Sequence, residues 1–218
     1  METAERPAAT TAILTPGPPA DWSASRLLRL EQARSRSPTA SKDVRPGRDG
    51  LDAEVKSIAT GTVGDRPIAV TGSADGTVRL WDLRTRAGGR LVGAHDAAVG
   101  AMAIGTARGQ TVAISGGEDG DVRLWRLTES SPIGVSLGGR ISNAVKTVAI
   151  GAAHGRDLAL AGSDDGAIRL WDLATARLYG PGLTGPGTGP EALGICSLNA
   201  RTTVLSGHWD GTLWTWSL

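Results

Sequence analysis

Three residues of this chain belong to the types that form a hydrolase site. His95, Ser115 and Asp119 lie close together in the sequence. In such a site the serine attacks the substrate, the histidine removes the serine proton and the aspartate orients the histidine. Whether these side chains can do this chemistry depends on the elements that position them.

Metal and phosphate chemistry find less support. The chain has three histidines and one cysteine, Cys196, and they are scattered rather than spaced as zinc ligands. Its Asp-Gly pairs supply one carboxylate each, too few oxygens for calcium, and no glycine-rich loop ends in Lys-Ser or Lys-Thr. We therefore expect no metal and no cofactor. We also expect Cys196 to be buried and inert, and His154 and His208 to lie at the surface.

Composition and charge restrict the class of partner. Lys and Arg number 23 and Asp and Glu 22, so the chain lacks the positive field of a nucleic-acid binder. No apolar run approaches the roughly 18 residues of a membrane span, and the first residues do not resemble a signal peptide. A single cysteine excludes an intrachain disulfide. We expect a cytoplasmic protein that binds neither nucleic acid nor membrane.

One short phrase is written four times. GSADGTVRLWDL at 72–83 returns as GGEDGDVRLWRL at 116–127, GSDDGAIRLWDL at 162–173 and GHWDGTLWTWSL at 207–218. The tryptophan that follows each Asp-Gly pair recurs at spacings of 44, 46 and 45 residues. Such a period indicates a repeat architecture.

Each unit has the pattern of a strand meander. Two apolar runs precede the Asp-Gly turn, whose glycine tolerates positive φ, and a third run then alternates with period two. A fourth, weaker run follows in three units, at 89–93, 132–137 and 177–183. Each unit is therefore predicted to form an antiparallel sheet, with the small Ala and Gly residues of its first two strands near a crowded centre.

The chain divides near residue 50. Residues 1–50 hold six of the eleven prolines, and we expect a disordered linker with one short helix over 21–36. Residues 51–218 form the repeat domain, with units at about 51–93, 94–139, 140–186 and 187–218.

The repeated phrase resembles the tryptophan–aspartate (WD40) repeat, the unit of a β-propeller, and its wording is similar to bacterial tandem arrays. The resemblance covers about 51–218. It implies an all-β propeller in which a His, a Ser or Thr, the turn Asp and the Trp of a unit form a buried hydrogen-bond chain. The second unit alone matches the full set, and the others have fewer members. The structural repeat residues implied are Asp75, Trp81, His95, Ser115, Asp119, Trp125, Asp165, Trp171, Asp210 and Trp216.

The same resemblance argues against a hydrolase. The indole of Trp125 would occupy the space beside the serine hydroxyl, and the sequence indicates no donors for an oxyanion. We therefore expect no enzyme activity.

The number of units leaves three alternatives open. Family rings usually contain seven units, and this chain has four, the last of which ends after three strands. The chain is then the C-terminal part of a longer or decayed product, or two copies complete a ring of eight units, or it forms an open arc with exposed faces. The source of the last unit's outer strand stays undecided.

Two functions are compatible with these observations. The first is a non-catalytic scaffold that presents propeller loops to a protein or peptide, with partner-binding candidates Trp209, Glu118, Asp164 and Glu54. An exposed aromatic residue often dominates an interface, which favours Trp209. The alternative is the regulatory or sensor arm of a larger signalling protein of the protease, kinase or nucleotide-binding type.

Overall fold

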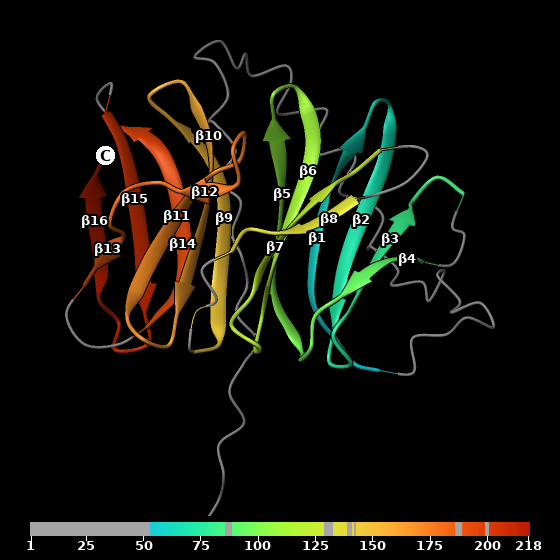
Figure 1. Ribbon diagram of the computed structural model, residues 1–218, viewed down its shortest axis with the longest axis horizontal. Coiled ribbons are helices and arrows are strands. Elements are labelled where there is room, and N and C mark those ends of the chain that lie inside the picture. Colours follow the sequence, from blue (N-terminus) through green and yellow to red (C-terminus); the bar gives the residue numbers. More distant parts are fainter. Residues whose placement is uncertain are drawn as a thin grey trace, which may run out of the picture.

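The computed structural model describes residues 53–85, 89–128, 133–138, 141, 143–185, 189–198 and 201–218. Every regular element in these ranges is a β-strand, and the strands form four antiparallel sheets that lie side by side in chain order (Figure 1). The prediction of an all-β fold built from four repeats is confirmed. The predicted tail over 1–50 and its helix over 21–36 lie outside the described residues.

We call each sheet a blade. Blade 1 contains β1 (Val55–Val63), β2 (Arg66–Ser73), β3 (Thr77–Asp82) and β4 (Arg90–Ala94). Blade 2 contains β5 (Val99–Ala107), β6 (Gln110–Gly117), β7 (Val122–Arg126) and β8 (Ile133–Ser136). Blade 3 contains β9 (Val145–Ala153), β10 (Arg156–Ser163), β11 (Ala167–Asp172), β12 (Arg177–Leu178) and β13 (Leu183–Thr184). Blade 4 contains β14 (Pro190–Leu198), β15 (Arg201–His208) and β16 (Leu213–Ser217).

The fourth strand of blade 3 is interrupted. Sequence analysis predicted one strand over 177–183, whereas β12 and β13 are two short pieces that both pair with β11. Between them Gly180 and Gly182 have φ values of 74° and 85° on either side of Pro181. Positive φ is incompatible with an extended strand and proline cannot donate a ladder hydrogen bond, so the pairing breaks there.

The Asp-Gly turns have the same construction in every blade. The glycines Gly76, Gly120, Gly166 and Gly211 all have positive φ, from 75° to 83°. The preceding aspartate accepts a hydrogen bond from the backbone N–H two residues later, for example 2.9 Å between Asp75 Oδ1 and the nitrogen of Thr77. An aspartate side chain that binds the backbone in this way stabilises a tight turn. The turn is thus determined by two adjacent residues.

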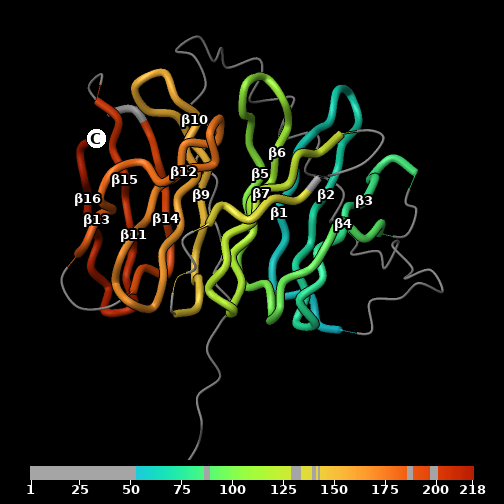
Figure 2. Tube along the Cα trace, viewed as in Figure 1, coloured from blue at the N-terminus to red at the C-terminus, as the bar shows by residue number. Residues whose placement is uncertain are grey.

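The core lies between the blades. Three clusters of buried apolar side chains fill the junctions between blades 1 and 2, 2 and 3, and 3 and 4. The first strands β1, β5, β9 and β14 contact one another in that order and form the inner side of the row. The tube view shows the same order, with blades 1 and 4 at opposite ends (Figure 2).

The two end blades each leave one sheet face open. Among the described residues no sheet covers the face of blade 1 that carries Ile58, or the face of blade 4 that carries Leu213, and both side chains are exposed.

The open face of blade 4 corrects the expectation that Cys196 is buried. Cys196 pairs with Thr203 on the open face of blade 4, and its side chain is only partly covered.

Candidate functional site

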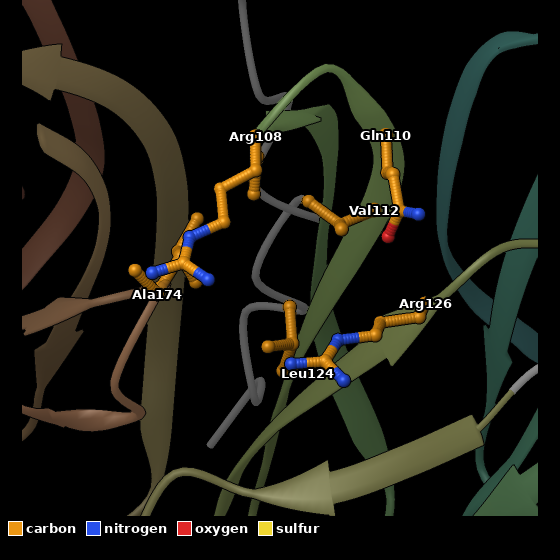
Figure 3. A pocket seen from close by; sticks show the side chains of 8 residues that line it. Arg108, Gln110, Val112, Leu124, Arg126 and Ala174 are labelled. Carbon is orange, nitrogen blue, oxygen red and sulfur yellow. The ribbon is translucent and has the colours of Figure 1, made fainter.

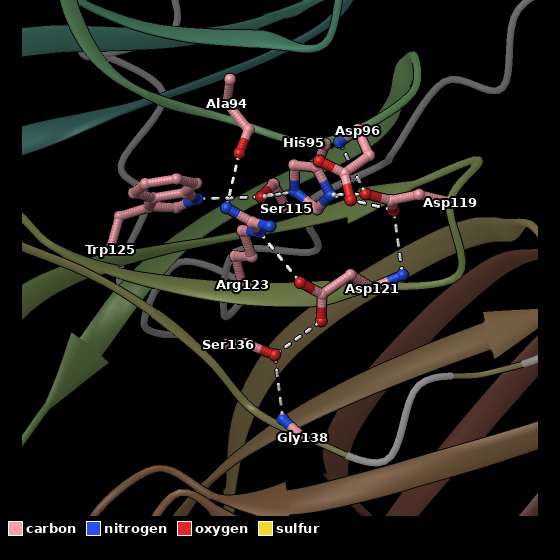
Figure 4. A network of polar contacts seen from close by, with 10 residues as sticks. All are labelled: Ala94, His95, Asp96, Ser115, Asp119, Asp121, Arg123, Trp125, Ser136 and Gly138. Atoms are coloured by element: carbon pink, nitrogen blue, oxygen red, sulfur yellow. Dashed lines mark hydrogen bonds and ion pairs between the residues drawn. The ribbon is translucent and has the colours of Figure 1, made fainter.

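The polar centre of blade 2 is a chain of four side chains (Figure 4). Nε1 of Trp125 lies 2.8 Å from Oγ of Ser115, which lies 2.7 Å from Nε2 of His95. Nδ1 of His95 in turn lies 3.1 Å from Oδ1 of Asp119. The structure therefore brings together the four residues that the sequence assigned to the second unit. We call this set the blade 2 relay.

The chemistry of its two ends determines the direction of the relay. An indole N–H only donates and a carboxylate only accepts. Trp125 therefore donates to Ser115, Ser115 donates to Nε2 of His95, and His95 donates from Nδ1 to Asp119. This arrangement requires a neutral histidine, and burial does lower the pKa of His95 below its ordinary value even though Asp119 opposes the shift.

The carboxylate of Asp119 is held in its charged form. Burial by itself would raise its pKa, but hydrogen bonds from the backbone of Asp121 and Asp96 and from His95 outweigh that effect, so the pKa is lowered. The distances to these donors are 3.0, 2.9 and 3.1 Å. Asp119 therefore fixes both the turn and the histidine ring.

The relay has the distances of a Ser-His-Asp triad, but substrate cannot reach it. Ser115 is fully buried in β6, and Trp125 and His95 on either side of it are also buried. The hydroxyl already accepts a hydrogen bond from the indole, which occupies the side a substrate carbonyl would need. The blades would have to separate before this serine could act as a nucleophile.

Sequence reasoning missed a branch of this network. Oδ1 of Asp121 accepts from Ser136 Oγ at 2.7 Å, and Oδ2 accepts from Arg123 Nε at 2.9 Å. The Arg123 guanidinium also donates to the carbonyl of Ala94 in blade 1. The signal was the second acid in Asp-Gly-Asp, since the other three units have threonine or alanine at this position.

The other blades have shorter versions of the relay. In blade 1 the Trp81 indole donates to Thr71 Oγ1 at 2.9 Å. In blade 3 Nε1 of Trp171 is buried with no partner among the described residues. Ser163 instead donates to Asp165, which also accepts from Arg169.

In blade 4 Ser206 and Nε2 of His208 are 2.8 Å apart and both are buried. The expectation that His208 lies at the surface was wrong, because His208 is the last residue of β15 and its ring turns back onto the sheet. His154 is exposed, as expected.

Three of the four repeated tryptophans pack at the junction with the preceding blade, whereas Trp81 of blade 1, which has no preceding blade, packs against Gly89. A Cβ atom on Gly93 of β4 would lie 2.6 Å from the Trp125 ring, so only glycine fits there. Trp171 is fully buried between blades 2 and 3, and Trp216 packs into the cluster between blades 3 and 4. These indoles fill the spaces between sheets.

The turns that connect the second and third strands of the blades form one surface, which we call the turn face. It carries the residues that precede each turn aspartate, namely Ala74, Glu118, Asp164 and Trp209. Backbone hydrogen bonds of 2.8 Å join Ala74 to Glu54 and Glu118 to Ala98, so in blades 1 and 2 the residues before the first strand lie beside these turns. Trp209 is 73% exposed.

The acidic candidates on the turn face differ in their pairing. Asp164 lies 3.3 Å from Lys146, and Glu54 lies 4.0 Å from Lys56. Glu118 is exposed and has no ion pair within the described part of the chain. The lysines reduce the negative charge of this surface, which leaves Trp209 as its most distinctive side chain.

A cavity of about 290 Å³ opens between blades 2 and 3 (Figure 3). Val112, Leu124 and Leu173 line it together with Arg108, from the β5–β6 turn, and Arg126, from the end of β7. The two guanidinium groups beside an apolar floor favour an anionic group.

The cavity reflects a departure of blade 2 from the repeat. At the corresponding positions of blades 1 and 3, Arg66 pairs with Asp82 and Arg156 pairs with Asp172. Blade 2 has Gln110 and Arg126 at these positions, so this ion pair is missing.

Other kinds of site are not seen in the part of the chain that the structure describes. No three His, Cys, Asp or Glu side chains in these ranges are grouped as metal ligands. The described residues also contain no helix with the length and apolarity of a membrane span.

Comparison with known proteins identifies the fold family. The family model for the WD40 domain, the G-beta repeat, matches residues 50–82, 90–126 and 135–172. No curated protein sequence matches the chain. The crystal structure of the computationally designed Ika4 protein is similar, with 26% sequence identity and a TM-score of 0.61 over 83% of this chain and 99% of that one. The recurring Asp-Gly turns, the interleaved tryptophans and these matches lead to one conclusion: the chain belongs to the WD40 repeat family.

Proposed function

We propose that this protein is a non-catalytic scaffold that presents its turn face to a protein or peptide partner. WD40 propellers commonly mediate protein interactions, and fold alone does not select the partner. The observation that carries the proposal is Trp209, which is 73% exposed at the turn between β15 and β16. An exposed indole offers a large apolar surface at little cost in side-chain entropy and often anchors an interface.

The surroundings of Trp209 favour an apolar contact with a polar rim. Asp164 and Glu54 have lysine neighbours, so the partner does not need a strongly basic surface. Glu118 is the acidic candidate that is free to meet an arginine or lysine of the partner. We therefore expect the indole to provide most of the affinity.

Photo-crosslinking at defined positions tests this proposal. An aromatic photoreactive amino acid, which keeps a large apolar ring at this position, replaces Trp209 in the native cell. A matched variant carries the same amino acid at Leu178, which is 54% exposed on β12 and lies off the turn face. We expect a discrete crosslinked protein from position 209 that position 178 does not give. Identical products from both positions, or none from position 209, would contradict the proposal. Far-UV circular dichroism confirms that both variants keep the β-fold.

We also propose that the scaffold is assembled from more than one copy of the chain. The support is the pair of sheet faces that have no neighbouring sheet among the described residues. Ile58 on blade 1 and Leu213 on blade 4 are 61% and 67% exposed. Large apolar side chains grouped on open sheet faces usually mark an interaction surface.

A further inference from the structure

The three junctions inside the chain share one contact at the start of each first strand. Val99, Val145 and Pro190 begin β5, β9 and β14, and each rests on a glycine of the preceding blade. Those glycines are Gly72, Gly116 and Gly162, and a Cβ atom at any of them would collide with the side chain above it. A projecting side chain and a glycine hole thus define the register of neighbouring blades.

A second contact repeats further along the first strands. Ile104 of blade 2 lies over Gly61 of blade 1, with 2.6 Å between its Cγ2 and the place of a Cβ on that glycine. Ile150 lies over Gly105 in the same way at 2.7 Å, and Ile195 lies over Gly151. Every internal junction therefore pairs an isoleucine with a glycine.

The two open faces carry the two residues that would make the first contact, but among the described residues no other blade packs against either of them. Val55 of blade 1 stands where Val99 and Val145 stand in their blades, yet it is 41% exposed while they are buried. Gly207 of blade 4 stands where Gly72 stands in blade 1, and a Cβ there would meet only Ala192, at 3.8 Å. The projecting side chain is at one end of the row and the matching hole is at the other.

The second contact is altered at both ends in compensating directions. Blade 1 has Thr60 where the later blades have isoleucine, and blade 4 has Cys196 where the earlier blades have glycine. A threonine and a cysteine together occupy about the same space as an isoleucine and a glycine, and packed contacts tolerate such volume-conserving exchanges best. The smaller Thr60 of blade 1 therefore leaves room for the larger Cys196 of blade 4.

The exposed apolar side chains of the two open faces stand at positions that are buried in the internal junctions. Ile58 occupies the position of Met102 and Val148, which are buried at internal junctions. Leu213 occupies the position of Val78, Val122 and Ile168, which are also buried. Both exposed residues would be covered if the open faces met as the internal ones do.

We propose that the open face of blade 4 in one copy packs against the open face of blade 1 in a second copy, and that two such contacts close a ring of eight blades. This inference rests on the proposed assembly of several copies and specifies its contact. Contacts between unlike faces form a closed ring when the rotation completes a turn. Propellers typically have four to eight blades, so two copies reach that limit and three would exceed it.

A disulfide across the proposed contact tests the pairing directly. At the junction of blades 1 and 2 the Cβ of Ile104 lies 3.6 Å from the Cβ position on Gly61, and disulfide-bonded Cβ atoms are about 3.5–4.5 Å apart. The variant Thr60→Cys should therefore form a disulfide with the native Cys196 of a second copy under mild oxidation. The control Thr62→Cys, two residues further along the same face, should not.

Two measurements decide the outcome. Light scattering should give the full chain twice its monomer mass, and Ile58→Asp or Leu213→Asp should convert it to a monomer with an unchanged circular dichroism spectrum, because both residues are exposed within one copy. Crosslinking of Thr60→Cys should disappear in the Cys196→Ser background.

If the wild-type chain is a monomer at millimolar concentration, the inference is wrong. This holds even if another segment of the chain or another protein covers the open faces. Thr60→Cys dimers that persist without Cys196 would overturn it too. Crosslinking from Trp209 to a different protein does not depend on these results, so the scaffold proposal succeeds or fails separately.

Discussion

Replacing Ser115 by alanine breaks the blade 2 relay at its centre. The indole N–H of Trp125 loses its acceptor and Nε2 of His95 loses its donor, and both side chains are buried. A buried polar group left without a partner costs about 1–3 kcal/mol. Two such groups give an expected loss of about 2–6 kcal/mol in the free energy of unfolding, which is a large share of the stability of a typical domain.

Blade 1 supplies a matched control. Thr71 occupies the position of Ser115, but its hydroxyl accepts a single bond from Trp81 and no histidine is attached to it. Thr71→Val keeps the shape of the side chain and leaves only one buried donor unpaired, so we expect about 1–3 kcal/mol. Urea unfolding followed by tryptophan fluorescence measures both variants. One protomer concentration is used throughout, because assembly shifts apparent stability.

The comparison between these two variants is the decisive result. If Ser115→Ala destabilises the protein no more than Thr71→Val, the histidine does not contribute to the relay and the hydrogen-bond direction assigned above is wrong. If both variants are neutral, water reaches the indoles and these centres are not as tightly closed as the structure shows.

Three further predictions follow from individual sites. Burial lowers the pKa of His95 below 6.5, so the contribution of this residue to the free energy of unfolding should be fully present above that pH. Below it the free energy of unfolding should fall by at most about 1.4 kcal/mol per pH unit. Urea midpoints measured between pH 5 and 8 should lose this slope in His95→Gln. Burial by itself would raise the pKa of Asp165, but hydrogen bonds from Arg169 and Ser163 outweigh it and lower the pKa to about 2. The contribution of Asp165 to the free energy of unfolding is therefore present above about pH 4 and should vanish as the pH falls toward 2. Acid titration of Asp165→Asn should show a smaller loss of stability than that of the wild type. Gly105→Cys should lower the free energy of unfolding by about 1–3 kcal/mol, because the added side chain overpacks against Ile150. In a double-mutant cycle, adding Ile150→Thr should restore part of that loss. Strictly additive effects of the two substitutions would refute the volume exchange.

The repeating parts of the molecule could be predicted because they depend on neighbours in the sequence. The Asp-Gly turn needs only an aspartate that binds the backbone two residues ahead and a glycine with positive φ. The strands on either side follow from the alternation of apolar residues. The same local rules explain why the predicted fourth strand of blade 3 is interrupted, since Gly180 and Gly182 have positive φ.

Other features were decided by packing between segments far apart in the chain. The sequence suggested the members of the blade 2 relay, but the burial of Ser115 that keeps substrate away comes from packing at the junction of blades 1 and 2. His208 is buried although its local sequence is that of a turn, and Cys196 is partly exposed although its strand is apolar. In each case the side chain responds to whether another sheet covers its face.

The sequence by itself determined four β-meanders with tight turns and an interleaved tryptophan, because period and turn chemistry are local properties. Only the tertiary structure decided which glycines receive which side chains and which two faces stay open. That information depends on the register between blades, and register is fixed by close contacts between residues far apart in the chain, such as Gly61 with Ile104 and Gly105 with Ile150.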